Sequence, residues 1–178
     1  MRCHAFVDES ARPGRYLIAV VLVPSHRLVA ATREVKGLFP RGNRRTHLSA
    51  EGKARRRMLL KAYGQVSVEA RVLSVPHAGG DDQPAREACL GALVTCAPEW
   101  GVGMLVLDSR GPHRDARDRR FIARSVLRGD VDLHYTHRGS RDEPLLCLPD
   151  AVGWAVGAGG TWRQLVDPIV AEVIDVEP

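Results

Sequence analysis

The chain has 178 residues, of which 44% are hydrophobic and 26% charged, and its net charge is +5. This length can bury one core, and the longest apolar run, Leu17 to Pro24, is far shorter than the roughly 18 residues that span a bilayer. No charged stretch followed by a long apolar run opens the chain. We therefore expect a single domain over residues 1–178, without a membrane span and located in the cytoplasm.

Cysteine usage and charge narrow the function further. The four cysteines form no C-x-x-C pair, so we expect small buried thiols rather than a zinc site. The positive net charge suits an acidic partner such as nucleic acid. Only three of the 26 basic residues are lysine, and coding bias alone can produce such an excess of arginine.

The first half of the chain predicts a hairpin, two helices and a further strand. Residues 2–8 form a strand, a turn follows, and the continuous apolar run 16–23 is typical of an interior strand that pairs with the first. Helices are expected from Ser25 and from Ser49, each with the serine as N-cap. The alternation over 66–75 then indicates a half-exposed strand.

The second half alternates helices and strands. Helices are expected over 84–97, over 112–127 and around Asp150, and strands over 102–108, 131–135 and 170–176. An opening hairpin followed by this alternation predicts an α/β fold with a mixed sheet covered by helices.

Four carboxylates lie where these apolar segments begin or end. Asp8 closes the first strand and Asp108 the fourth, Glu51 lies just inside the second helix, and Asp150 lies in the apolar helix near the end. Two unit charges about 4 Å apart repel by about 4 kcal/mol at an effective dielectric near 20. Because a divalent cation is the usual remedy for such repulsion, the pattern predicts a metal-dependent site.

Three motifs carry a family resemblance: Phe6-Val7-Asp8-Glu9-Ser10, Leu105-Val106-Leu107-Asp108, and Leu146-Cys147-Leu148-Pro149-Asp150-Ala151-Val152-Gly153-Trp154. With them the chain resembles an uncharacterised bacterial family with a ribonuclease H-like fold, which begins with a D-E-S strand end and finishes with an L-x-x-x-D helix. The resemblance implies a ribonuclease H-like mixed sheet flanked by helices. It also implies acids that hold Mg²⁺ or Mn²⁺ for nucleic-acid cleavage. Carried onto this chain, the metal ligands are Asp8, Asp108 and Asp150, with Glu51 as a fourth ligand or as the base for the attacking water.

Basic residues near Glu51 form the expected phosphate track. His47 could orient a water or contact a phosphate, and Lys53 could neutralise developing charge. A solvated surface is the plain alternative for each of them. The expected nucleic-acid contacts are Arg44, Arg45, His47, Lys53 and Arg56.

The sequence therefore leads to the hypothesis of a Mg²⁺- or Mn²⁺-dependent nuclease that hydrolyses phosphodiester bonds of RNA or DNA. One alternative is a nucleic-acid-binding module on the same fold without turnover. Another is a protein-interaction module, for example within a toxin or defence system. Residue spacing leaves the choice of RNA or DNA and the oligomeric state open.

Overall fold

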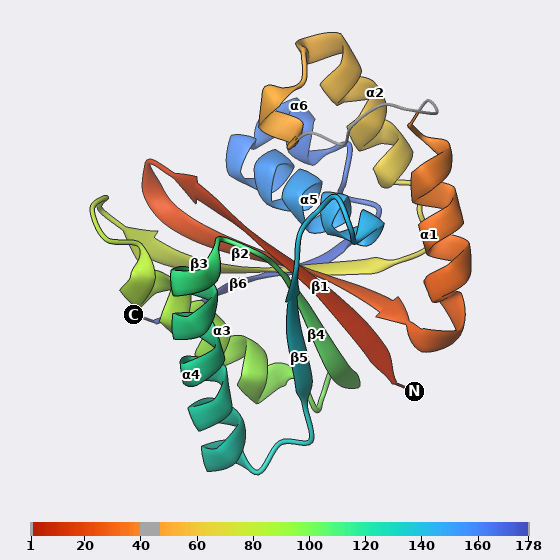
Figure 1. Cartoon of the computed structure of the whole chain (residues 1–178). Helices are drawn as coiled ribbons and strands as arrows, with labels where there is room; N and C mark the ends of the chain where they lie inside the picture. Colours follow the sequence, from red (N-terminus) through yellow and green to blue (C-terminus); the bar gives the residue numbers. More distant parts are fainter. Residues whose placement is uncertain (1, 40–46, 178) are drawn as a thin grey trace.

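A six-stranded mixed sheet forms the centre of the computed structural model, which describes residues 2–39 and 47–177 (Figure 1). Its spatial order is β5-β4-β1-β2-β3-β6. The first three strands pair antiparallel, whereas β4 lies parallel to β1, β5 to β4, and β6 to β3. The strands are β1 (Cys3–Arg12), β2 (Gly14–Pro24), β3 (Glu69–His77), β4 (Val102–Asp108), β5 (His134–Arg138) and β6 (Val170–Asp175).

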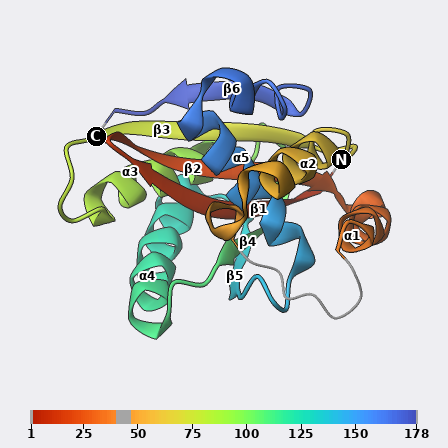
Figure 2. The ribbon, with the colours of Figure 1, turned by 90° about the horizontal axis from the view of Figure 1, so that it is seen from above.

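Helices cover both faces of this sheet. Figures 1 and 2 show α3 and α4 on one side, with α1, α2 and α5 on the other. This arrangement confirms the expected α/β class with a mixed sheet flanked by helices. Within the described residues, no helix is both long and apolar enough to cross a membrane. The helices are α1 (Leu28–Gly37), α2 (Lys53–Tyr63), α3 (Gln83–Cys96), α4 (Pro112–Gly129), α5 (Cys147–Ala158) and α6 (Gly160–Arg163), with 3₁₀ turns η1 (Ser25–Arg27), η2 (Leu48–Ala50) and η3 (Pro144–Leu146).

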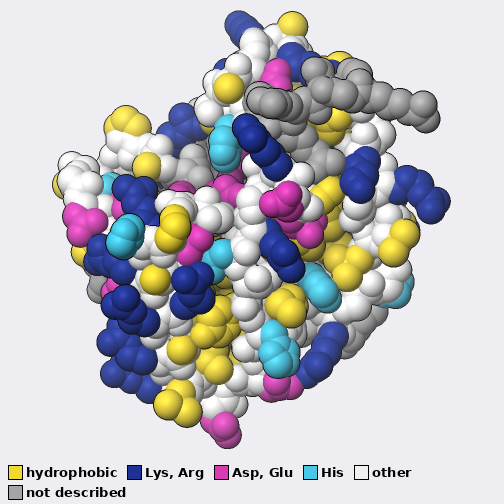
Figure 3. Space-filling model, in the orientation of Figure 1, with side chains coloured by type: hydrophobic (Ala, Val, Ile, Leu, Met, Phe, Trp, Pro, Cys, Tyr) yellow, Lys and Arg dark blue, Asp and Glu magenta, His cyan; other side chains and the backbone are white. Residues whose placement is uncertain are grey.

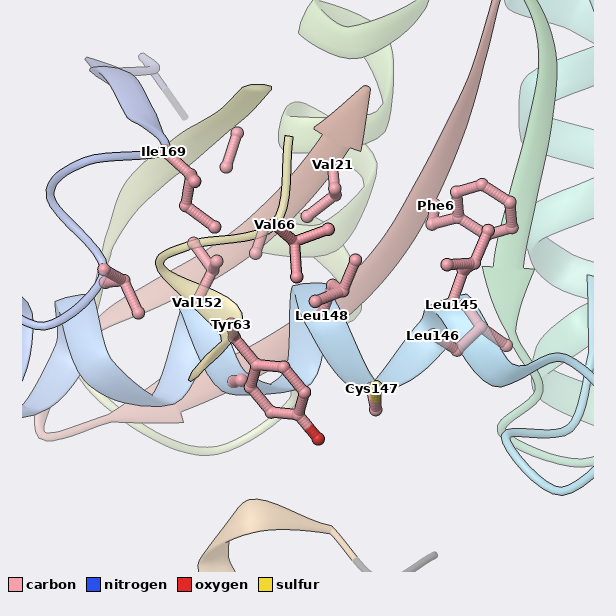
Figure 4. Packing of buried hydrophobic residues seen from close by; sticks show 14 of the residues in the cluster. Phe6, Val21, Tyr63, Val66, Leu145, Leu146, Cys147, Leu148, Val152 and Ile169 are labelled. Atoms are coloured by element: carbon pink, nitrogen blue, oxygen red, sulfur yellow. The ribbon is translucent and has the colours of Figure 1, made fainter. Parts of the chain in front are cut away.

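Alternate residues of the central strands feed two separate cores, because successive side chains of a strand point to opposite faces. Phe6 and Val21 pack on the α5 side against residues such as Leu148 (Figure 4). Their neighbours Val7 and Val20 pack on the side of α3 and α4. Strand β2 is therefore buried on both faces, as its unbroken apolar run predicts.

The opening strand is longer than predicted. It extends to Arg12, four residues past Asp8, because Arg12 still pairs with Arg15 at the end of the hairpin. Gly14 makes the connection with a φ of +81°, which glycine adopts without strain. Asp8 therefore lies within a paired strand and not at its free end.

The second helix begins later than predicted. Ser49 lies in the short turn η2, Glu51 has an extended backbone, and α2 starts at Lys53 with Gly52 as its N-cap and no side-chain capping bond. The expectation of a Ser49 cap with Glu51 inside the helix was therefore wrong. The serine is instead the middle residue of a single 3₁₀ turn that begins at Leu48.

Gly153 lets α5 lie close to the sheet. A Cβ at this position would be 3.3 Å from the Cβ of Ser10 and 3.5 Å from that of Ala19. Both neighbours belong to central strands and cannot move freely. A side chain here would push α5, and the Asp150 that it carries, away from β1.

We expect Gly153→Val to destabilise the protein by about 1–3 kcal/mol, since added carbons must be forced between α5 and the strands. Equilibrium unfolding in guanidinium chloride measures the change. Gly37→Val is the matched control, because a Cβ at Gly37 meets nothing within 4 Å, and its effect should stay within about 0.5 kcal/mol. Equal effects of the two substitutions would contradict this account of the α5 packing.

Candidate functional site

Two adjacent parallel strands bring Asp8 and Asp108 together. Val7 of β1 pairs with Leu107 of β4, and the two aspartates are the next residues of each strand. Phe6 and Val106, two residues earlier, both belong to the core on the α5 side, so strand alternation turns both carboxylates towards α5. Both are buried, with 6% of Asp8 and 9% of Asp108 exposed.

Helix α5 adds a third carboxylate, Asp150, in its first turn. Its Oδ2 accepts a hydrogen bond of 2.6 Å from the backbone N–H of Leu48. Its Oδ1 lies 3.4 Å from Nδ1 of His47. Asp150 therefore joins α5 to the segment that carries the histidine.

These side chains share one cleft of about 480 Å³, a size typical of ligand sites. Acids and a histidine occupy part of its wall, and arginines occupy another part. Its charged and imidazole lining consists of Asp8, Glu9, Asp108, Asp150, His47, Arg12, Arg110 and Arg114.

Three of the lining residues could hold one metal ion. Asp8, His47 and Asp150 each offer a ligand atom, and these atoms lie within 4.8 Å of one another. Carboxylate oxygens suit Mg²⁺ and Mn²⁺, and imidazole is a common ligand for transition metals. Asp108 lines the same cleft outside this group of three.

Burial and repulsion disfavour the charged forms of both strand carboxylates. Burial, followed by the charges of Glu9, Asp150 and Asp108, raises the pKa of Asp8 well above its usual range. A hydrogen bond from the backbone N–H of Glu9 opposes this rise. Burial likewise raises the pKa of Asp108 to about 6, with His47 opposing the rise.

His47 is the cation of the acidic group. Its hydrogen bond with Asp150 is the main cause that raises its pKa to about 9, and the charges of Asp150, Asp8 and Asp108 add to the rise while burial opposes it. The protonated imidazole, with 57% of its side chain exposed, partly neutralises the three carboxylates. Neutralising them is also what a bound cation would do.

Not every residue singled out in the sequence is found among the lining of this cleft. Glu51 and Lys53 are not among the described residues that line it. Arg44 and Arg45 lie outside the described residues. The cleft thus brings together Asp8, Asp108, Asp150 and His47, but not Glu51.

Arg56, expected to contact nucleic acid, is committed to the protein itself. Its guanidinium donates to the backbone carbonyls of Leu48, Ser49 and Glu51, at 3.1, 3.0 and 2.6 Å. It also lies 4.4 Å from the ring centroid of Trp154 on α5, a cation–π contact. Arg56 therefore clamps the turn after His47 onto α5.

The sequence analysis did not identify the arginines that line the cleft. Arg12 follows Asp8 and Ser10 at two-residue intervals on one face of β1, a signal hidden by the assumption that the strand ends at Asp8. Arg12 donates to the carbonyl of Trp154 at 2.9 Å and lies 5.4 Å from its ring. Arg114 comes from the first turn of α4.

Glu9 points to the opposite face of β1, towards a buried ionic network. Arg86 of α3 donates to Glu9 at 2.8 Å and, through two nitrogens, to Asp118 of α4 at 2.8–3.0 Å. Arg86 and Asp118 are 1% and 0% exposed. Such an internally paired network holds α3, α4 and β1 together.

Further donors neutralise Asp118. Arg110 lies 3.3 Å and His137 also 3.3 Å from its carboxylate. Burial tends to raise the pKa of Asp118, but the hydrogen bonds from His137 and Arg86 and the neighbouring positive charges outweigh it and hold this pKa well below its usual range. The acid is therefore ionised and satisfied within the chain, in contrast to those of the cleft.

Comparison with known proteins finds similarity to solved structures. No family model matches the chain, and no curated protein matches it. The crystal structure of RNase H1 from the halophilic archaeon Halobacterium salinarum NRC-1 is similar over 78% of this chain and 86% of that chain, with 18% sequence identity and a TM-score of 0.37.

The raised pKa of Asp108 predicts a pH-dependent gain in stability from Asp108→Asn. A raised folded-state pKa contributes stability below the unfolded value of 3.8, and this is lost as the pH rises through about 6. With EDTA present, the variant should therefore be more stable than the wild type by about 1–3 kcal/mol at pH 8 and nearly equal to it below pH 4. Asp142→Asn, at an exposed position, is the control. Denaturant unfolding at both pH values measures the effect, and a destabilised variant at pH 8 would contradict the repulsion argument.

Proposed function

We propose that this protein is a nuclease that depends on Mg²⁺ or Mn²⁺ and hydrolyses phosphodiester bonds of RNA or DNA. One observation carries the proposal. Asp8, Asp108 and Asp150, from three separate elements, line one cleft whose wall also holds His47 and several arginines. Acids suit a cation and arginines suit a phosphate, and a metal-assisted phosphodiesterase needs both.

The donor set fits a hard divalent cation. Asp8 and Asp150 would hold it, with Asp108 beside them and His47 at the position for which Glu51 was expected. When bound, such an ion supplies Lewis-acid stabilisation of phosphate charge and lowers the pKa of a water. The repulsion that raises the pKa values of Asp8 and Asp108 supports this fit, because a cation would relieve it.

The remaining residues of the cleft would bind and orient the substrate. Arg12 is held by the carbonyl and ring of Trp154, so its guanidinium is already oriented before a phosphate arrives. Arg114 lies exposed at the edge of the cleft and is free to meet the backbone of an incoming strand. His47 would contribute as a ligand or as a proton donor to the phosphate, according to whether it keeps its proton.

We expect Asp8→Asn to lower metal-dependent cleavage by at least about a hundredfold, since it removes a ligand charge without changing side-chain volume. Labelled RNA, DNA and RNA–DNA hybrid strands, each with Mg²⁺, Mn²⁺ or EDTA, provide the assay. Glu51→Gln is the matched control and should keep its activity within about threefold. If the wild type binds these strands but never cleaves them, the protein is a binding module without turnover. Cleavage that persists in EDTA would refute the proposal.

Metal affinity should depend on pH, because protons compete with the cation for the same carboxylates. The pKa of Asp108 is raised to about 6 and that of Asp8 is also raised, so Mn²⁺ should bind about tenfold more tightly at pH 7.5 than at pH 5.5. Isothermal titration calorimetry measures both affinities. Repeating it in buffers of different ionisation enthalpy counts the protons released, and His47→Ala should reduce that count if the imidazole is a ligand. An affinity that does not change with pH would contradict this donor set.

A further inference from the structure

Helix α4 exposes many arginines and no acidic side chain. It carries two acids, Asp115 and Asp118, and both are buried. Its arginines do not form salt bridges within the described part of the chain. These arginines are Arg114, Arg117, Arg119, Arg120, Arg124 and Arg128, and all six are exposed.

Four of these arginines form one stripe. Arg117, Arg120, Arg124 and Arg128 follow at intervals of three, four and four residues, which places them on the same side of a helix. At 1.5 Å per residue the stripe is about 16 Å long. Figure 3 shows Lys and Arg side chains gathered on the side of the molecule where α4 lies.

This stripe is unfavourable for the isolated helix. Like charges three or four residues apart destabilise a helix by about 0.2–0.5 kcal/mol per pair, and no acid interrupts the series from Arg117 to Arg128 on the exposed surface. A polyanion bound along the helix would convert this repulsion into attraction. Alternating Glu and Arg at the same spacing would stabilise a surface helix whose role is purely structural.

The stripe is rigidly connected to the acidic cleft. Asp115 accepts hydrogen bonds from the Oγ of Ser109 at 2.6 Å and from the backbone N–H of Arg110 at 2.9 Å. These bonds fix the turn between Asp108 and the first turn of α4. Ser109, Arg110 and Arg114 line the cleft themselves, so the positive surface begins at the proposed site of cleavage.

We propose that α4 is the docking surface for the phosphate backbone of a double-stranded nucleic acid whose scissile strand enters the acidic cleft. The inference rests on the proposed function and adds a substrate class to it. Arginine forks suit phosphates, and a duplex offers about one charge per 1.7 Å of its axis. Sequence-tolerant binding of single strands uses aromatic platforms on which bases stack, whereas Phe121, the aromatic residue of α4, packs inward.

The sequence led us to expect the phosphate track in the basic patch next to α2. The arginines of this patch that the structure describes are less available for that role. Arg56 is committed to three backbone carbonyls. Arg55 donates to the carbonyl of Leu38 and the sulfur of Met58. Among the described arginines of α2, only Arg57 is exposed.

The test compares two variants with the same net charge. The α4 variant carries R117Q, R120Q, R124Q and R128Q; the control variant carries R33Q, K36Q, R57Q and K61Q, four exposed positions on α1 and α2. Fluorescence anisotropy with a labelled DNA duplex and an RNA–DNA hybrid, in EDTA and over a range of salt concentrations, measures binding without cleavage. We expect the α4 variant to lose affinity by at least about tenfold and its salt slope to fall by about 3, while the control changes by less than about twofold.

Several outcomes would overturn the inference: equal affinities and salt slopes for the two variants, tighter binding of single strands than of duplexes by the wild type, or no duplex binding at all. Thermal unfolding shows that the variants are folded, and Mn²⁺ titration shows that the cleft is intact in the α4 variant. The proposed function is tested separately by the Asp8→Asn cleavage assay. Duplex binding through α4 without any metal-dependent cleavage would remove the nuclease proposal and leave this one in place.

Discussion

Repulsion among carboxylates buried where β1, β4 and α5 meet is the constraint on which the rest of the site depends. Backbone pairing fixes Asp8 beside Asp108, and the close approach of α5 at Gly153 fixes Asp150 next to them. Asp8 and Asp108 are buried, and the backbone N–H of Leu48 holds the carboxylate of Asp150. The acidic part of the cleft is therefore a group of like charges that a cation can stabilise.

The acids on the two faces of β1 have opposite electrostatic surroundings. Glu9 and Asp118, on one face, are matched by the buried guanidinium of Arg86 and need nothing from outside the chain. Asp8, on the other face, has like charges around it, with His47 as the neighbouring cation. Because internal pairing lowers the pKa of an acid and crowding raises it, the contrast separates a structural charge network from a candidate functional site.

The sequence was sufficient for the order of the elements and the interior hairpin, since each depends on local alternation or on the ends of apolar runs. The same signals singled out Asp8, Asp108 and Asp150, which the structure brings to one cleft. It was insufficient for the surroundings of Glu51, Arg56 and His47, because these depend on how the turn η2 packs against α5, about 100 residues later in the chain. A serine followed by an acid predicts a helix start. In the structure the backbone N–H of Leu48 donates to Asp150, and the segment forms a 3₁₀ turn beside the cleft. The sequence predicted a strongly charged helix at α4. It did not show that the acids of this helix lie on its buried side, because that depends on the partners of these acids in the folded protein.

The parallel pairing of β1 with β4 also determines when the cleft can exist during synthesis. Asp8 and its hairpin partner are close in sequence and can pair early, whereas Asp108 and Asp150 follow 100 and 142 residues later. A nascent chain on the ribosome thus carries an incomplete acidic site until α5 has emerged and docked. The three carboxylates can therefore hold a shared cation only after α5 has been synthesised and has docked on β1, so any hydrolytic capacity of the cleft is withheld until then.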